Sequence, residues 1–359
     1  MIARIKTVTE EHLARGVIGF LGLIHLIMAL SLLMVLATLE RADAQEQPAA
    51  CGGENLIDRM RAEDDPRLPA LLEAAAATPN GEGLLWRVEN EEGVASYLLG
   101  TMHVADPRVT ELTNTVSQAL DASETVVIET DEILDPEVAQ AALIARPELT
   151  MFTDGRTLRT VMSDEDFALV ETRLDELGLP VDALVHMKPW MIAGLVALPA
   201  CEHARKAEGA AFLDQMLAEQ ALADGKAVDG LETIAEQLDA MASLSLEFHV
   251  RGLVETLSLG PLLEDVTATM TDLYVAGETG MIMPMLREAA PEGHERDAQG
   301  YADFEERIVL ARNRIMAERA EPFLDEGHAF IAVGALHLPG DEGVIELLRD
   351  AGYSVERAD

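Results

Sequence analysis

The sequence predicts an α/β protein with a mixed central sheet, and three observations support this fold class. From about residue 84, short apolar segments typical of strands alternate with segments of helical periodicity, which is the pattern of α/β folds. Two of the apolar segments, SYLLGTMH at 96–103 and FIAVGALH at 330–337, end in Gly-x-x-His. A long stretch with helical spacing lies between them. We therefore expect two similar units, each made of a strand, a Gly-x-x-His motif and a helix, on either side of a large helical middle.

The first 44 residues have the pattern of an export segment. Basic residues within 1–15 precede a run without formal charge over 16–39, and Ala42-Asp43-Ala44 then matches the small-x-small pattern of a signal peptidase site. The uncharged run is also long enough to cross a bilayer, so an uncleaved anchor is the alternative. We expect a periplasmic or secreted protein, or else one anchored in the inner membrane and facing the periplasm. Membrane contact is expected only if the segment stays attached.

The chain has two cysteines, Cys51 and Cys201. In an oxidising compartment such a pair tends to form one disulfide, which would tie the start of the exported chain to its middle. Two unpaired thiols are the alternative if the chain is cytosolic. The sequence has no Cys-x-x-Cys, so neither a thioredoxin-type redox site nor a zinc ribbon is indicated.

Local signals place the first elements of the fold. We expect an N-terminal segment over 45–83, followed by an α/β domain over 84–359 with a helical insertion at about 135–322. Residues 83–90 and 93–100 are predicted to form two strands joined by a tight turn. A helix is predicted after Asp106, which can cap it, with Pro107 in its first position. Residues 124–132 then form a short buried strand that ends in acids.

The later elements are predicted in the same way. Within the helical middle we expect helices over 163–178 and 211–226, a short strand over 226–233, and a loop rich in Pro, Gly and charge over 280–299. The C-terminal part repeats the early pattern: a strand over 328–337, a helix over 344–352 that Asp341 can cap, and a final strand. This similarity suggests a remote internal duplication.

Composition excludes several classes of function. Asp and Glu number 65 against 26 Lys and Arg, which gives a formal net charge of −39. Such a surface repels phosphate backbones, so no nucleic-acid partner is expected, and the acidity is expected to keep the protein soluble. The chain also lacks HExxH, GxSxG, the GxxxxGK[ST] phosphate loop and GxGxxG, so a serine or cysteine hydrolase is not indicated.

The Gly-x-x-His motifs indicate a site at the edge of the sheet. In open α/β sheets, ligands bind outside the carboxyl ends of the strands, where His103 and His337 are predicted to lie. Glu129 closes another predicted strand. Two imidazoles and one carboxylate form the ligand set of a hydrolytic metal site, with an open position for water. Asp131 or Glu132 can replace Glu129 in this scheme, and each histidine can instead be a hydrogen-bonding or capping residue.

A set of motifs in this order resembles the TraB/GumN family, which includes the Tiki proteases. The motifs are YLLGTMH, VVIET, KPW, FLDQMLAEQALADGKAVDGLETIAEQL, ARNRIM and FIAVGALHLPGDEGVIELLRDAGYSV, and the resemblance spans residue 51 to the C-terminus. It implies a fold related to ChaN and the erythromycin esterases, with both GxxH motifs and a glutamate in one cleft. It also implies metal-dependent peptidase activity, with His103, Glu129 and His337 as metal ligands or catalytic groups.

The resemblance extends to further positions. Arg312 and Asn313 match an Arg-Asn pair of the family and are expected to bind a substrate carboxylate or an oxyanion; surface salt bridging is the alternative. Lys188, Trp190 and Glu232 are interpreted as structural.

The leading hypothesis is an exported metal-dependent hydrolase of the peptidase kind. Its cofactor would be a divalent metal, Mn, Co or Zn, and its substrate a peptide or small molecule. The contrasting hypothesis is a non-catalytic periplasmic binding protein that sequesters a peptide, haem or a polysaccharide precursor in the same cleft.

Overall fold

The computed structural model describes residues 51–289 and 297–359. Ala50–Asp359 form one compact unit. The predicted export segment, residues 1–44, lies outside the described residues, and so does the part of the predicted loop from 290 to 296. Across the described ranges, no helix is both long and apolar enough to cross a membrane.

The described residues form a mixed six-stranded sheet in the order β4-β3-β5-β2-β1-β6. The strands are β1 (Leu85–Glu89), β2 (Ala95–Thr101), β3 (Thr125–Ile128), β4 (Ala227–Gly230), β5 (Ala329–Gly334) and β6 (Ser354–Arg357). Four neighbouring strands, β4, β3, β5 and β2, run parallel, whereas β1 is antiparallel to both β2 and β6. The predicted α/β class with a mixed central sheet is therefore confirmed.

Strand β5 occupies the centre of the sheet and sets the register of its neighbours. Gly100 of β2 pairs with Val333 of β5, and Ile128 of β3 pairs with Ala332 of β5 and with Gly230 of β4. The four parallel strands therefore end at almost the same level. Residues that directly follow them are gathered at one edge of the sheet.

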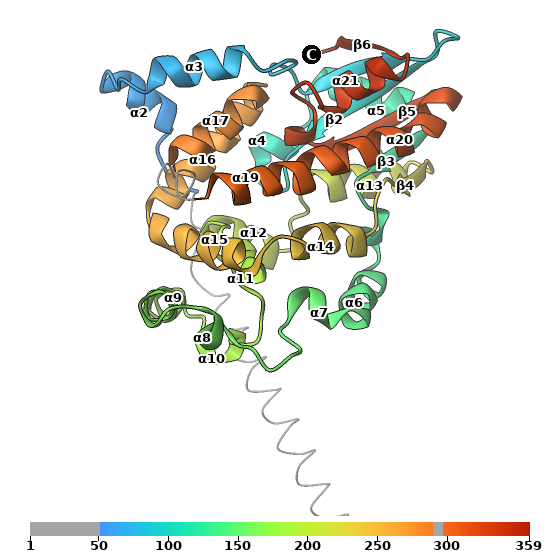
Figure 1. Cartoon of the computed structure of the whole chain (residues 1–359). Helices are drawn as coiled ribbons and strands as arrows, with labels where there is room; N and C mark the ends of the chain where they lie inside the picture. Colours follow the sequence, from blue (N-terminus) through green and yellow to red (C-terminus); the bar gives the residue numbers. More distant parts are fainter. Residues whose placement is uncertain (1–50, 290–296) are drawn as a thin grey trace, which may run out of the picture. The chain divides into compact units, whose positions relative to one another are not determined.

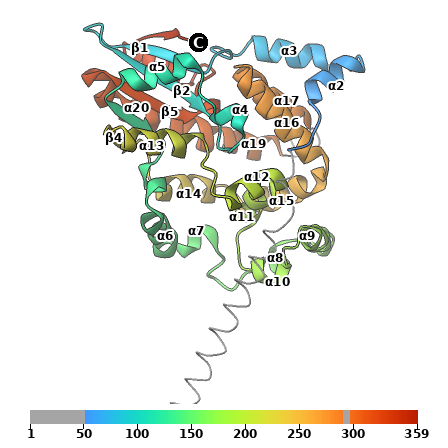
Figure 2. The same ribbon diagram turned by 180° about the vertical axis from the view of Figure 1, so that it is seen from behind.

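Helices cover both faces of the sheet, as the two opposite views show (Figures 1 and 2). On one face, α5 (Asn114–Ala122) and α13 (Leu213–Ala223) pack against Leu99, Ile128 and Phe330. On the other, α20 (Ala311–Glu326) and α21 (Val344–Asp350) pack against Leu98, Val127 and Ile331. Because both of their faces are buried, the inner strands β3 and β5 are almost continuously apolar in sequence, as is usual for parallel strands.

Two further helical clusters have cores of their own. One buries Phe167, Leu174, Ile192 and Leu253 between α9 (Asp164–Glu176), α11 (Pro189–Val196) and α15 (Leu246–Leu259). The other packs α2 (Leu56–Ala62) and α3 (Leu68–Ala76) against α16 (Leu262–Val275) and α17 (Thr279–Ala289). The other helices of the described ranges are α4 (Pro107–Thr110), η1 (Asp131–Leu134), α6 (Pro136–Ala145), α7 (Pro147–Thr150), α8 (Leu158–Val161), α10 (Val181–Leu184), α12 (Ala200–Ala207), α14 (Ile234–Ala242), α19 (Ala298–Phe304), η2 (Glu305–Leu310) and η3 (Ala335–His337).

Several local predictions differ from the structure. The single helix expected after Asp106 is divided into α4 and α5, because Thr113 adopts an extended conformation and its side chain caps the new helix at Val116 N. Asp341 does not cap α21, which begins after Gly343 with no side-chain cap. Of the predicted loop over 280–299, residues 280–289 lie in α17 and residues 298–299 begin α19. The short strand predicted over 226–233 is present as β4. The duplication and the domain boundaries stay predictions.

The predicted disulfide between Cys51 and Cys201 is present. It joins the residue shortly before α2 to α12, across 150 residues of sequence. A cross-link over so long a segment removes many conformations from the unfolded chain, which stabilises the folded state.

We predict that replacing both cysteines by serine lowers the free energy of unfolding by about 2–5 kcal/mol, because the unfolded chain regains the entropy that the cross-link removes. Denaturant unfolding of the oxidised parent and of the double variant measures this difference. Reductant should shift the unfolding midpoint of the parent and leave that of the variant unchanged. Equal midpoints for the oxidised parent and the variant would show that the bond has no stabilising role.

Candidate functional site

A pocket of about 250 Å³ opens at the carboxyl ends of β2, β3 and β5. It brings together four residues singled out from the sequence, His103, Glu129, Arg312 and His337. The rest of its lining comes from α16, α17, the last residues of β2 and β5, and the residues that follow these strands: Thr101, Met102, Met270, Tyr274, Ile282, Gly334, Ala335 and Leu336. The predicted convergence of the two Gly-x-x-His motifs is thus present in the structure.

Both motif glycines lie where a larger residue would crowd its neighbours. A Cβ at Gly100 would lie 2.8 Å from Leu338 Cδ1 and 3.1 Å from Ala335 Cα, within the turn that carries His337. A Cβ at Gly334 would lie 3.0 Å from Glu129 Oε1. Glycine therefore lets β2 approach the turn after β5, and lets the Gly334 N–H reach the glutamate.

Glu129 is the centre of a buried hydrogen-bond network. Its Oε1 accepts from Gly334 N at 2.7 Å, and its Oε2 accepts from Arg312 Nη2 at 2.7 Å and Gln237 Nε2 at 3.1 Å. Arg312 also donates to both carboxylate oxygens of Glu232, at 2.6–3.1 Å. The guanidinium thus bridges the carboxylates that follow β3 and β4. Such paired charge-assisted bonds fix both geometry and charge.

The network keeps Glu129 ionised. Burial by itself raises the pKa of the carboxyl group, but the neighbouring His337, His103 and Arg312, together with the Gly334 N–H, outweigh burial and lower the pKa to about 2. A carboxylate with so low a pKa is a poor proton donor or acceptor near neutral pH. It is suited to binding a cation.

His337 is held in one tautomer by Asn313. The Asn313 Nδ2 donates to the Glu342 carbonyl oxygen at 2.8 Å, so its Oδ1 faces His337 Nδ1 at 2.6 Å and must accept from it. The Nε2 then carries a lone pair, 3.9 Å from Glu129 Oε1. Burial lowers the pKa of His337 to about 4, although Glu129 opposes this shift. The ring is therefore a neutral imidazole, as metal ligation requires.

His103 lies beside a buried acid, Asp214, at the start of α13. Its Nε2 is 3.5 Å from Asp214 Oδ2, and 55% of its side chain is exposed in the pocket. Partial burial lowers the pKa of His103, but the Asp214 carboxylate offsets this effect and the net pKa is raised. Asp214 is only 2% exposed, and Thr101 Oγ1 donates to its other oxygen at 2.8 Å.

The loop after His103 is anchored to α12. The Ala105 N–H donates to Glu202 Oε2 at 2.8 Å, and Arg205 forms ion pairs with Glu202 and with Asp106. Glu202 is 1% exposed, so this anchor is internal. Glu202 directly follows Cys201, the cysteine of the disulfide that lies in α12.

Sequence reasoning did not find three of these residues. Asp214, Gln237 and Glu202 lie near the starts of amphipathic helices, where an acidic or amide residue usually serves the helix itself. The only feature of the sequence that could have pointed to a buried role for these residues is their apolar neighbours, as in FLDQ for Asp214. Glu232 was interpreted as structural, and its two-oxygen pairing with Arg312 agrees with that interpretation.

Asp131 and Glu132, the alternatives to Glu129, do not line the pocket. Glu132 Oε2 accepts from Ile234 N at the start of α14, and Asp131 is exposed. Lys188 and Trp190 belong to the start of α11, and the Trp190 ring packs near His249. Asn313 lies behind the pocket and is fully buried.

The donor chemistry of the pocket fits a divalent cation. A neutral imidazole, an ionised carboxylate and the half-exposed His103 ring face one cavity. In addition, Asp214 Oδ2 is buried; its ion-pair partner is His103 Nε2 at 3.5 Å, and a bound cation would add to the compensation of its charge. Of the residues that the structure describes, those whose potential ligand atoms lie within 4.8 Å of one another are Cys51, Cys201 and Glu202. The disulfide occupies that cluster. The ligand atoms of His103, Glu129 and His337 do not all lie within this distance of one another, so binding of one ion by all three requires a movement of at least one side chain.

Comparison with known protein families places the chain in one of them. The profile of the TraB/PrgY/gumN family matches residues 84–357, and the chain belongs to this family. Among solved structures, none shows significant similarity to it.

The curated relatives are named metalloproteases. The chain is 25% identical over 323 residues to metalloprotease TIKI2 of Danio rerio, covering 76% of this chain and 60% of that protein. It is 26% identical over 323 residues to the metalloprotease TIKI homolog of Nematostella vectensis, covering 77% and 67%. Human metalloprotease TIKI1 is 25% identical over 320 residues, covering 76% and 61%. The chain thus spans about three fifths to two thirds of the length of these relatives.

We predict that Arg312→Gln lowers the free energy of unfolding by about 3–5 kcal/mol, because it leaves two neighbouring carboxylates buried without a cation. Arg314→Gln is the matched control. Arg314 lies on the same helix and pairs with Glu306 and Glu342, but it is exposed, so its loss should cost less than about 1 kcal/mol. Denaturant unfolding measures both values, and similar values for the two variants would contradict the central role of Arg312.

We predict that native stability falls as pH is lowered, through His337. Its pKa is about 4 when folded and 6.5 in a model peptide, so between these values the unfolded state binds a proton that the native state does not. The free energy of unfolding should therefore decrease by about 3 kcal/mol from pH 7 to pH 4 through this group.

Chelator-treated protein and its His337→Gln variant, unfolded in denaturant at each pH, isolate this contribution. The difference in unfolding free energy between parent and variant should shrink over the window. His186→Gln, altered at an exposed ring outside the pocket, should follow the parent. A parent-to-variant difference that is constant from pH 7 to 4 would refute a neutral His337.

Proposed function

We propose that this chain is an exported metal-dependent peptidase whose active site is the pocket at the carboxyl ends of β2, β3 and β5. The observation that carries the proposal is the convergence there of His103, His337 and Glu129, the latter two in the charge states that metal ligation requires. Membership of a family whose curated relatives are named metalloproteases supports the same reaction.

His103, Glu129 and His337 would hold the metal, and Asp214 would add negative charge beside His103. When bound, a divalent metal supplies an activated water and a Lewis acid for a carbonyl oxygen. Mn, Co and Zn all suit imidazole and carboxylate ligands.

The remaining residues act by positioning these groups. Asn313 orients the His337 ring through Nδ1, and Arg312 with Gln237 orients the Glu129 carboxylate. Because the Arg312 Nε and Nη2 are occupied by carboxylates and Asn313 is fully buried, we assign both residues to orientation of the ligands. A substrate would contact the apolar wall formed by Met102, Met270 and Leu336.

Export is part of the proposal. The pattern of residues 1–44 and the disulfide both favour an oxidising compartment outside the cytoplasm.

We predict that the purified protein, equilibrated with Mn, Co and Zn in turn, retains about one equivalent of one of these metals and cleaves members of a peptide library. His103→Ala and His337→Ala should lose the metal and the cleavage together, because each removes a ligand. His186→Ala, changed at an exposed ring outside the pocket, should retain both. Elemental mass spectrometry measures the metal, and mass spectrometry of the library detects the cleavage.

The outcomes separate an enzyme from a binding protein. Metal and cleavage lost in both pocket variants support the peptidase. Peptide binding without cleavage under every metal condition would instead identify a binding protein. Metal content in the parent no higher than in the two pocket variants would refute the metal site.

A further inference from the structure

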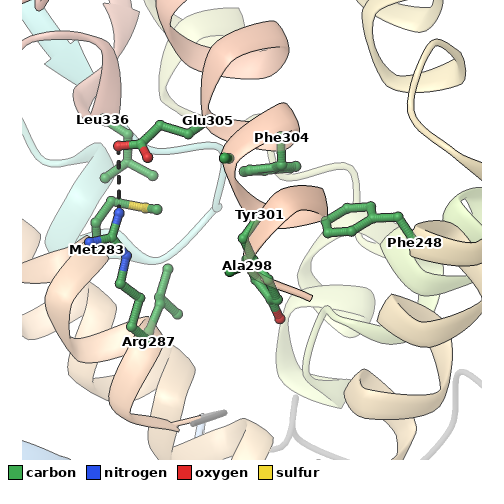
Figure 3. Close-up of a pocket in the computed structure, with 10 residues that line it drawn as sticks. Phe248, Met283, Arg287, Ala298, Tyr301, Phe304, Glu305 and Leu336 are labelled. Atoms are coloured by element: carbon green, nitrogen blue, oxygen red, sulfur yellow. Dashed lines mark hydrogen bonds and ion pairs between the residues drawn. The ribbon is translucent and has the colours of Figure 1, made fainter. Parts of the chain in front are cut away.

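A second, larger cavity adjoins the candidate active site. It measures about 530 Å³ and lies between α15, α17 and α19, with η3 at one side (Figure 3). We call it the apolar pocket. Its main apolar walls are Phe248, Met283, Leu286, Phe304 and Leu336.

The two cavities share a wall. Leu336 lines both of them, and the next residue in η3 is His337. In α17, Ile282 lines the candidate active site and the next residue, Met283, lines the apolar pocket. If a peptide binds beside His337, a neighbouring side chain of that peptide can therefore reach the apolar pocket.

The lining is suited to a large apolar group. The Phe248 ring meets Tyr301 nearly edge-on, with centroids 5.5 Å apart, and lies 6.0 Å from Phe304. Met283 and Leu336 face these rings across the cavity (Figure 3). Phe248, Met283, Phe304 and Leu336 are all only partly buried, so their apolar surface is open to a ligand. Aromatic and methionine side chains adapt to aliphatic and aromatic groups alike.

The charges at this cavity leave its apolar part undisturbed. Arg287 Nη2 and Glu305 Oε1 lie 3.5 Å apart, on the side of the cavity away from Phe248 (Figure 3). Because the two charges are opposite and pair with each other, together they add no net charge to the cavity. A cavity that is mostly apolar with a few polar groups is typical of sites that bind an apolar portion of a ligand.

We propose that the apolar pocket is the subsite that selects a large apolar side chain, aliphatic or aromatic, of the peptide held at the His103, Glu129 and His337 site. The inference rests on the proposed peptidase function, because it assigns the pocket to a part of that enzyme's substrate. Removing such a side chain from water favours the bound state. A substrate with Leu or Phe at the selected position should be cleaved about 10- to 100-fold more efficiently than one with Ala.

The test fills the pocket from an exposed position. Ala302 lines the pocket and is exposed on α19, so Ala302→Phe places a ring in the cavity without disturbing a core. Ala298→Phe, at the start of the same helix, is the second filling variant. Gln299→Phe is the matched control, since Gln299 is exposed on α19 but does not line the pocket. Thermal unfolding of each variant confirms that it is folded.

The readout is kcat/KM for peptides scanned with Ala, Leu and Phe at each position. The parent and Gln299→Phe should prefer Leu or Phe to Ala by about tenfold or more at one position. In both filling variants this preference should fall to within about twofold. Cleavage by the parent with no apolar preference at any position would overturn the subsite and leave the peptidase intact.

Equilibrium binding separates this inference from the proposed function. Fluorescein-labelled octa-alanine peptides carrying one Phe at each position in turn serve as probes, and fluorescence anisotropy reports their affinity. If the parent cleaves nothing, a Phe-dependent affinity that Ala302→Phe abolishes and Gln299→Phe retains would support the pocket while refuting the peptidase. Affinity that does not depend on the Phe, together with no cleavage, would overturn both.

Discussion

The bridge that Arg312 forms between Glu129 and Glu232 is the interaction on which the rest of the site depends. The two carboxylates follow neighbouring strands, β3 and β4, and are 6% and 5% exposed. Side by side in a buried setting they would repel each other, and one would take up a proton. The guanidinium removes that repulsion and keeps Glu129 charged. Because Asn313 follows Arg312 directly on α20, the helix that positions the carboxylates also positions the ring of His337.

The helical run from α19 to α20 connects the two cavities. The π-helical segment η2 lies within it, just before Arg312. Such segments insert an extra residue into a turn and occur often at functional sites. Before η2, the run presents Tyr301 and Phe304 to the apolar pocket; after it, Arg312 reaches the ends of the strands. The change in helical phase therefore lets one continuous helix serve a hydrophobic wall and a buried ion-pair network.

The sequence predicted those parts of the site that depend on local pattern. His103, Glu129 and His337 follow strands whose apolar runs are unambiguous, and the parallel arrangement brings such positions to one edge of a sheet. Arg312 and Asn313 were identified through family resemblance, but their partners, Glu232 and His337, are known only from the fold. Asp214 was missed because an acid in the first turn of a helix has an ordinary local role. The break between α4 and α5 was missed because Thr113 competes with the helical pattern of its neighbours.

The central place of β5 has a consequence for when the pocket can form. Strand β5 lies between β2 and β3, yet it is made near the end of the chain, more than 200 residues after either neighbour (Figure 1). Contacts between residues so far apart form late, since long loops must close first. While β5 is missing, β2 and β3 have no common neighbour, His337 is absent and Glu129 lacks the Gly334 N–H. A chain that is still being synthesised therefore lacks the complete pocket, which forms only when β5 is inserted between β2 and β3.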